Sequence, residues 1–291
     1  MTLLARRLFK CKIIFVTYDL YPEIAVKMKA IGNESFIAKV MKKINKTLFR
    51  EVSHVVALSE DMKKYILNNR SIPPEKVSVI HNWATEELGC SEIQSTIFKN
   101  IRTKYGLVVS YFGNMGTAQD INTILEIIKD ERIRESNICF LFAGHGNKRE
   151  KIEELIKQKQ LSNSIMFDYL SGVDFEDALN ITDVFLVSLE KDISGLAVPS
   201  KTYSYYQSGK PVIAIMDKNT DVSKEIYKNN AGLAIENGEI EPLVEWLISL
   251  ENDKTQLTTM SMNVQKMFKD SYTKDLLLEK YVDLVNLVLE E

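Results

Sequence analysis

The stretch that decides the fold is residues 184–215, VFLVSLEKDISGLAVPSKTYSYYQSGKPVIAI. It begins and ends with short apolar runs, VFLVSL and PVIAI, that are typical of buried parallel strands. Between these runs the sequence predicts a helix. Pro199 suits the first helical position, because its fixed φ is helical and its missing N–H is not needed there. Gly209 is placed to end the helix in a left-handed conformation.

The beginning of this helix has the chemistry of an anion site. Ser200 and Lys201 lie in the first turn, where free N–H groups and the positive end of the helix dipole are available. Together with the lysine ammonium, these groups favour phosphate as the ligand. The alternative is an ordinary strand–helix–strand unit with a solvated lysine, and this stretch alone leaves both interpretations open.

Composition narrows the class of protein. The 291 residues are 45% hydrophobic and 26% charged, which is typical of a globular chain with one large or two medium domains. The cysteines Cys11, Cys90 and Cys139 are widely spaced and form no CxxC pair, which favours a reducing compartment and argues against structural zinc. No apolar run approaches the roughly eighteen residues of a membrane span, and no signal peptide is recognisable. We expect a cytoplasmic protein.

Charge is distributed unevenly along the chain. The first 50 residues hold eleven Lys and Arg against three acidic residues, so the remainder carries a net charge of −11. Residues 36–49, FIAKVMKKINKTLF, place apolar residues at helical spacing with lysines between them: Phe36, Val40, Ile44 and Leu48. Such a helix suits the anionic inner face of a cell membrane, although packing on a protein core is the alternative. The acidic pI and the lack of a base-reading motif argue against nucleic acid.

Strand, loop and helix alternate along most of the chain, which predicts an α/β fold with a doubly wound parallel sheet. We expect a partial Rossmann-like domain at residues 1–83, a linker at 84–105 and a complete Rossmann-like domain at 106–259. A C-terminal helix at 260–291 is expected to pack back toward the N-terminal part through an apolar face.

Small and polar residues follow the predicted strands, at the sheet edge where α/β proteins bind ligands. Gly113 and Gly116 follow the strand at 107–112 and allow a tight turn with exposed backbone, as in phosphate-binding loops, although the pattern is not a specific motif. Asp19 follows the strand at 12–17. It is a candidate site residue, and capping of the next turn is the alternative.

Three strings carry a resemblance to a known family: GNMGTAQDINTILE, FAGHGNKREKIEELI and GLAVPSKTYSYYQSGKPVIAIMD. In this order and spacing they resemble the donor-binding domain of retaining GT-B glycosyltransferases of family 4. The most similar subgroup is that of bacterial L-fucosamine (FucNAc) transferases of O-antigen and capsule biosynthesis. YDLYPEIAV, VVALSEDMKKYIL and IPPEKVSVIHNWA similarly resemble the acceptor-side domain. The chain is N-terminally truncated relative to that family.

The resemblance implies transfer of a sugar, such as an N-acetylated deoxyhexosamine, from a UDP-sugar to a lipid-linked or glycan acceptor without a metal. It implies catalytic roles for Lys201, which would stabilise the leaving diphosphate, and for Asp19. It also implies a donor-binding set. Gly113, Asn114 and Gly116 would line the diphosphate and sugar, with Gln119 at the entrance to the next helix, and Gly144 and His145 would face the nucleotide. Tyr169 and Leu170 would contact the base through their backbone, and the phosphates would be held by Ser194, Gly195, Pro199, Ser200 and Lys201.

This chain departs from the wider family at several site positions. Paired glutamates of the family would fall at Leu196 and Ser204, and its basic residues after the first glycine loop are replaced by residues such as Thr117 and Gln119. Lys201 is therefore expected to be the main positive charge on the phosphates.

The resemblance also places the start of the chain inside the acceptor domain. The strand at 12–17 is then expected to expose an apolar edge and an uncovered sheet face. A separate N-terminal subunit, self-association, or a remnant that binds nucleotide without turnover would each explain this, and all three stay open. A catalytically incomplete nucleotide-sugar-binding subunit is the alternative function, and an epimerase of related fold is a third.

Overall fold

The stretch 184–215 folds into strand, helix and strand: β7 (Val184–Ser188), α10 (Lys201–Gln207) and β8 (Val212–Ile215). The computed structural model describes residues 2–84 and 92–290, so the linker residues 85–91, Cys90 among them, lie outside the described residues. The chain forms two compact units. The first unit comprises Met1–Trp83, Asp192–Val198 and Ser271–Glu291, and the second comprises Ala84–Lys191 and Pro199–Asp270.

The second unit contains a six-stranded parallel sheet. Its remaining strands are β4 (Leu107–Phe112), β5 (Ile138–Ala143), β6 (Ser164–Phe167) and β9 (Gly232–Ile235). The order in the sheet is β6-β5-β4-β7-β8-β9, which is the doubly wound Rossmann order. The direction of winding reverses between β4 and β7, so the crevice at the carboxyl ends of these two strands is where the topology predicts a ligand.

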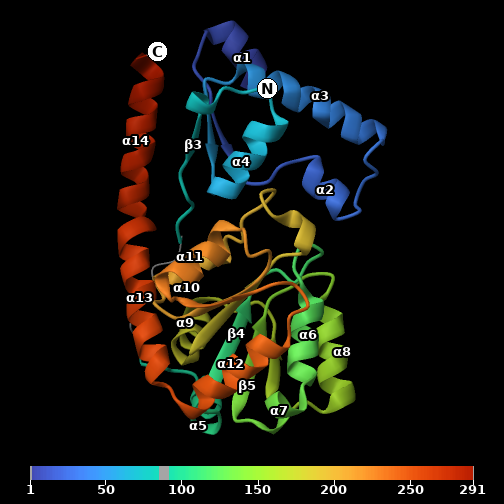
Figure 1. Cartoon of the computed structure of the whole chain (residues 1–291), viewed down its shortest axis with the longest axis vertical. Coiled ribbons are helices and arrows are strands. Elements are labelled where there is room, and N and C mark those ends of the chain that lie inside the picture. The colour runs from blue at the N-terminus through green and yellow to red at the C-terminus, as the bar shows by residue number, and fades with distance from the viewer. Residues whose placement is uncertain (1, 85–91, 291) are drawn as a thin grey trace. The chain divides into compact units, whose positions relative to one another are not determined.

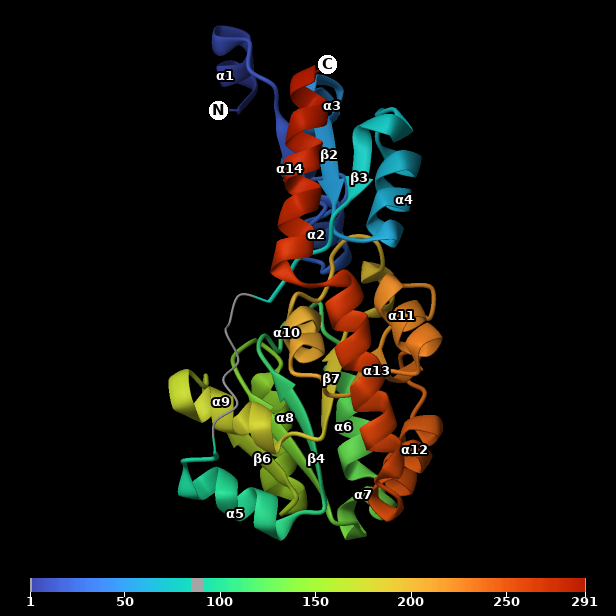
Figure 2. The ribbon, with the colours of Figure 1, turned by 90° about the vertical axis from the view of Figure 1, so that its left-hand side faces the viewer.

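Helices cover both faces of this sheet (Figures 1 and 2). They are α5 (Thr96–Lys104), α6 (Ile121–Lys129), α7 (Glu131–Glu135), α8 (Arg149–Lys159), α9 (Gly172–Ile181), α10, α11 (Asp221–Asn229), α12 (Glu241–Asn252) and α13 (Thr255–Ser271). Alternate strand residues such as Val109 and Phe140 join one core with apolar residues of α6, α7, α8 and α12. On the other face, Phe112 and Phe185 contact α9 and α10 through aromatic rings.

The first unit is built on three parallel strands in the order β1-β2-β3: β1 (Ile14–Thr17), β2 (His54–Ala57) and β3 (Val77–Val79). Its other elements are α1 (Thr2–Phe9), α2 (Glu23–Lys27), α3 (Phe36–Glu51), α4 (Glu60–Asn69), the 3-10 turns η1 (Pro74–Lys76) and η2 (Lys191–Ile193), and α14 (Lys274–Glu290). Phe15 of β1 meets Phe49 of α3 edge to face, 5.8 Å between ring centroids.

The C-terminal helix α14 lies along this sheet (Figures 1 and 2). Leu277, Leu284 and Val288 form one cluster with Val56 and Ile80, and Ile14 packs against it. The expectation of an uncovered sheet face was therefore wrong, because the chain's own last helix covers it. β1 remains an edge strand, as expected.

The α/β class and the parallel sheets predicted from the sequence are confirmed. Some local expectations differ from the structure. Helix α10 begins at Lys201 and not at Pro199, α1 and α7 were not predicted, and the C-terminal tail is two helices, not one. Within the described residues, every helix is too short or too polar to cross a bilayer.

Candidate functional site

The site lies where β4 and β7 end, at the reversal of the sheet. Gly113 follows β4 directly, with φ at 115°, a conformation that side chains rarely adopt. Its N–H donates to the carbonyl of Ala143, 2.8 Å away, so the turn stays attached to β5. This places an exposed bend of backbone at the predicted ligand edge, as the sequence indicated.

A second glycine loop, after β5, is pressed against the first. A Cβ on Gly144 would come within 2.1 Å of the Gly113 carbonyl oxygen, and one on Gly146 within 2.4 Å of Met115 backbone atoms. The Met115 N–H donates to the His145 carbonyl across 2.7 Å. The two loops therefore touch backbone to backbone, which only glycine allows at these points.

Lys201 is the charged group at this bend. Its Nζ lies 3.7 Å from the centroid of the Tyr111 ring, a cation–π contact. Built on Gly113, a Cβ would lie 3.6 Å from the lysine Cε and 3.7 Å from Nζ, so the ammonium faces the glycine turn. Although the lysine residue as a whole is only half-buried, its Nζ is buried and makes no hydrogen bond to any of the described residues.

An ammonium without a partner is costly to bury, because its charge loses hydration and gains nothing in return. Burial lowers the pKa of Lys201 from 10.5 to about 7. An anion beside Nζ would remove that cost by supplying charge and acceptors. The arrangement is therefore suited to a phosphate group at the Gly113 turn.

Part of the helix end beside Lys201 is satisfied within its own turn. The N–H of Thr202 donates to the Pro199 carbonyl at 3.0 Å, and that of Tyr203 to the Ser200 carbonyl at 3.2 Å. The expected contribution of this helix end to anion binding stays a prediction.

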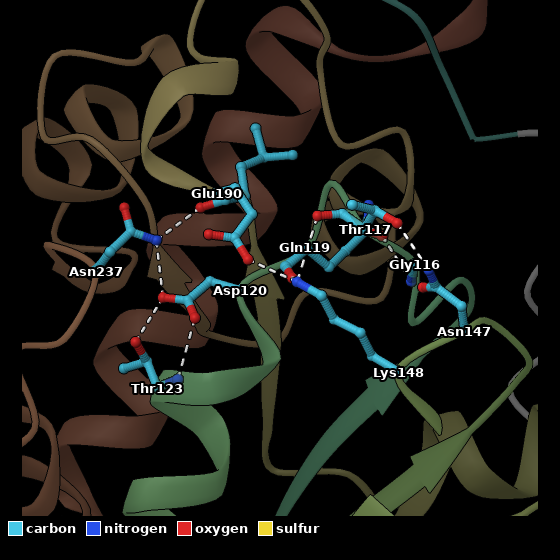
Figure 3. A network of polar contacts seen from close by, with 10 residues as sticks. Gly116, Thr117, Gln119, Asp120, Thr123, Asn147, Lys148, Glu190 and Asn237 are labelled. Carbon is cyan, nitrogen blue, oxygen red and sulfur yellow. Dashed lines mark hydrogen bonds and ion pairs between the residues drawn. The ribbon is translucent and has the colours of Figure 1, made fainter. Parts of the chain in front are cut away.

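A polar network holds the first glycine loop in place (Figure 3). Lys148 Nζ contacts Glu190 at 2.6 Å, the Gln119 carbonyl at 2.6 Å and the Thr117 carbonyl at 3.3 Å. The Gln119 side chain accepts the Gly116 N–H at 2.9 Å. The loop is thus connected to the segments that follow β5 and β7.

The same network continues from the end of the loop to the segment that follows β9 (Figure 3). Asp120 accepts the Thr123 N–H at the start of α6, and Asn237 donates to both Asp120 and the Leu189 carbonyl at 2.8 Å. Sequence reasoning missed Lys148, Glu190 and Asn237. Their position just after predicted strands was the signal that could have found them.

The remaining donor-side candidates follow the ends of β4, β5 and β6. Asn114, His145 and Tyr169 are exposed, and Leu170 is partly buried. Arg149, which sequence reasoning also missed, donates to the Gly144 carbonyl at 2.7 Å and pairs with Asp168 at 2.8 Å. No contact among those described brings His145, Tyr169 or Leu170 to Lys201, so their roles stay predictions.

Asp19, Ser194 and Gly195 belong to the first unit. Asp19 forms an isolated antiparallel bridge with Ala197, and partial removal from water raises the pKa of its carboxyl. Gly195 donates its N–H to Asp61 at 3.1 Å, so this donor is already paired. The structure does not place these residues with Lys201, and their proposed roles stay predictions.

Two α/β units, one of them with a Rossmann-ordered sheet, are the architecture of the GT-B fold. Solved structures of that class share the fold. Anabaena HepE in complex with UDP and glucose is 12% identical with a TM-score of 0.74, over 97% of this chain and 74% of that one. WaaG, a glycosyltransferase involved in lipopolysaccharide biosynthesis, is 15% identical with a TM-score of 0.71, over 97% and 80%.

The chain belongs to the family described as glycosyl transferases group 1, whose model matches residues 93–267. The model of glycosyltransferase family 4 matches residues 1–87. The probable glycosyltransferase WbjE of Pseudomonas aeruginosa is 24% identical over 96% of this chain and 69% of its own length. The poly(ribitol-phosphate) alpha-N-acetylglucosaminyltransferase of Staphylococcus aureus is 21% identical over 81% and 44%. The chain thus spans between about half and two thirds of such relatives.

Proposed function

We propose that this protein is a retaining glycosyltransferase that takes a sugar from a UDP-sugar and transfers it to a lipid-linked or glycan acceptor in surface polysaccharide synthesis. One observation supports this most directly: the buried, unpartnered Nζ of Lys201 at the Gly113 turn. A nearby lysine, Lys148, is already neutralised by Glu190 and by backbone carbonyls. Of these two cations, only Lys201 is available to a ligand.

In the proposed reaction the bond between the anomeric carbon and the diphosphate oxygen breaks, and the acceptor hydroxyl oxygen bonds to that carbon on the same face. Negative charge grows on the diphosphate as it leaves, and the Lys201 ammonium stabilises that charge. The acceptor's proton passes to the departing phosphate oxygen. Because a diphosphate is a good leaving group, the donor side requires no general acid.

The other predicted contacts follow from this placement of the diphosphate. Gly113, Asn114 and Gly116 would contact the diphosphate and sugar, and Gly144 and His145 the nucleotide. The backbone at Tyr169 and Leu170 would face the base, in keeping with the end of the edge strand β6. The narrower resemblance to L-fucosamine transferases, and with it the donor sugar, stays a prediction.

Binding of UDP to the full chain tests this proposal. Isothermal titration calorimetry should detect binding to the wild type and to Lys228→Met, a control at an exposed lysine of α11. Lys201→Met should lose at least about tenfold in affinity, since it removes the one charge that faces the turn. If UDP does not bind, or if it binds Lys201→Met as tightly as the wild type, the assignment of the phosphate site is wrong.

We also propose that α3 lies on an anionic membrane surface. Within the predicted apolar stripe, Phe36 is 82% exposed, Ile44 55% and Val40 39%, so most of the stripe does not pack on a core of the described residues. The lysines of this helix are exposed as well: Lys39, Lys42, Lys43 and Lys46. Exposed apolar side chains among lysines suit the boundary between anionic headgroups and acyl chains.

Flotation with vesicles that contain an anionic phospholipid tests this surface. The triple variant Lys42→Glu, Lys43→Glu, Lys46→Glu should float much less than the wild type. A matched triple on α8, with Lys151, Lys157 and Lys159 changed to Glu, should float normally, because these lysines are exposed while the apolar residues of α8 pack in the core. Equal flotation of both triples would exclude α3 as the contact.

A separate N-terminal subunit stays a prediction, with the free edge of β1 as its place of contact. Transfer to a lipid-linked acceptor should then require that added polypeptide, and efficient transfer by this chain alone would contradict it. The alternative of a non-catalytic nucleotide-sugar-binding subunit is less well supported, because the relatives named above are described as transferases.

A further inference from the structure

On one side, strand β4 loses its pairing partner β7 before it reaches the glycine turn. It pairs with β5 along its whole length, from Leu107 to Phe112. Its ladder with β7 stops earlier, at the pair of Ser110 and Phe185. In a strand, the backbone N–H and C=O groups of alternate residues point to the same side. Those of Phe112 therefore point, like those of Ser110, toward β7, which no longer pairs with β4 at this position. Both groups are deep in the protein and need partners.

One hydroxyl satisfies both groups. Tyr205 accepts the Phe112 N–H at 2.9 Å and donates its own hydrogen to the Phe112 carbonyl at 3.0 Å. Burial raises the pKa of Tyr205, so the hydroxyl keeps the proton that it donates. The ring stacks on Phe185 with centroids 4.1 Å apart and planes 9° apart, which fixes the direction of the hydroxyl.

Tyr205 stands one helical turn after Lys201 on α10, so the two side chains lie on the same face of that helix. Both reach the last residues of β4. Lys201 covers the Tyr111 ring, and Tyr205 binds the backbone of the next residue, Phe112, which precedes Gly113. The helix that carries the ammonium and the strand that carries the turn are therefore fixed to each other within two residues of the bend.

We propose that Tyr205 is a positioning residue that sets the spacing between the Lys201 ammonium and the Gly113 turn. This inference rests on the proposed function, in which that spacing is the width of the diphosphate site. The hydroxyl does not touch the ligand. It replaces the hydrogen bonds that β7 does not make with the end of β4. The end of β4 and the start of α10 therefore keep a fixed position relative to each other.

Tyr205→Phe removes the hydroxyl and keeps the stacked ring. Tyr105→Phe is the matched control, because the Tyr105 hydroxyl also donates to a backbone carbonyl, that of Ser162 at 2.5 Å, near the opposite end of β4. Both variants lose a buried hydroxyl–backbone bond, so both should be somewhat less stable. Only the first should change Lys201.

The first measurement needs no nucleotide. In protein labelled with ¹³C at lysine Cε, NMR follows the titration of Lys201, which is assigned by its absence in Lys201→Met. The midpoint should rise by more than about one pH unit in Tyr205→Phe, because a displaced ammonium regains water. It should stay near the wild-type value in Tyr105→Phe. An unmoved midpoint in Tyr205→Phe, or an equal rise in both variants, would overturn the proposal.

A second measurement uses UDP. Affinity should fall about tenfold in Tyr205→Phe and less than about twofold in Tyr105→Phe, as expected for a small displacement of a binding group. If Tyr205→Phe moves the lysine titration while the wild type fails to bind UDP, the proposed function fails and the positioning role holds. If UDP binds and the titration does not move, the positioning role fails and the proposed function holds.

Should Tyr205→Phe fail to fold, the wild type alone still tests the contact. Hydrogen exchange at the Phe112 amide should be as slow as at the paired amides of β4, because the Tyr205 hydroxyl, its partner among the described residues, holds it. Fast exchange at this amide would show that the hydroxyl does not hold the end of the strand.

Discussion

Replacing Lys201 with methionine should stabilise the free protein while it destroys the proposed ligand site. The free energy cost of the lysine follows from its pKa. Burial lowers that pKa from 10.5 to about 7, and each pH unit between the two is worth about 1.4 kcal/mol, which gives about 5 kcal/mol. A gain of up to about 5 kcal/mol is therefore expected for Lys201→Met at pH 6.5.

The sign of the pH dependence is fixed by linkage. Between pH 7 and pH 10.5 the unfolded chain binds a proton that the folded chain does not, so the free energy of unfolding rises with pH in that window. The penalty is complete below about pH 7 and disappears above about pH 10.5. Methionine does not titrate, so the advantage of Lys201→Met over the wild type should shrink as the pH increases.

Urea unfolding of both proteins at pH 6.5, 8 and 9.5 measures this advantage directly. Lys228→Met, at an exposed lysine, should match the wild type at every pH. With UDP at one hundred times its wild-type Kd the advantage should shrink, because the ligand adds about 2.7 kcal/mol to the wild type and about 1.4 kcal/mol to a variant that binds tenfold more weakly. A variant less stable than the wild type at pH 6.5, or an advantage that does not change with pH, would refute the reasoning about the buried ammonium.

Three other predictions concern the same site. UDP affinity of the wild type should fall about tenfold per pH unit above pH 7, because the diphosphate binds the ammonium form; calorimetry across pH 6.5–9 measures this. Gly144→Ala should prevent folding or UDP binding, whereas Gly172→Ala, with a positive φ but nothing within 4 Å of the added Cβ, should cost only about 1 kcal/mol in thermal unfolding. Lys148→Met should lower the free energy of unfolding by about 1–3 kcal/mol, because Glu190 and two carbonyls lose their donor; Lys151→Met should change it little.

The sheet of the second unit could be predicted because its central strands are buried on both faces. LVVSYF and ICFLFA are almost entirely apolar, a pattern that depends on local sequence only, and the structure gives them as the strands Leu107–Phe112 and Ile138–Ala143. The glycine turns that follow these strands could be predicted as well, because Gly113 and Gly144 adopt positive φ. Lys201 was predicted from its neighbours in the sequence.

The contacts that make the site could not be predicted in this way. Tyr111 and Lys201 are far apart in the sequence, and they meet because β7 lies beside β4 in the sheet order. The pairing of Lys148 with Glu190 likewise depends on which strand ends are neighbours. The face covered by α14 and the exposure of Phe36 depend on packing between distant segments, on which periodicity carries no information.

The two lysines at the first glycine loop have different roles: one holds the loop, and the other is the proposed binding group. The Lys148 ammonium binds one carboxylate and two carbonyls, which hold the loop in place. Because its charge is neutralised by these contacts, it adds little attraction for an anion. Lys201 has an aromatic ring on one side and no acceptor, so its charge is costly until an anion arrives. If a diphosphate binds as proposed, the free energy that the fold gives up at Lys201 returns on binding, and the proposed positioning by the Tyr205 hydroxyl would keep the ammonium beside the charge that it stabilises. A site of this kind binds a charged leaving group more strongly as its charge grows, which is the requirement for catalysis of sugar transfer.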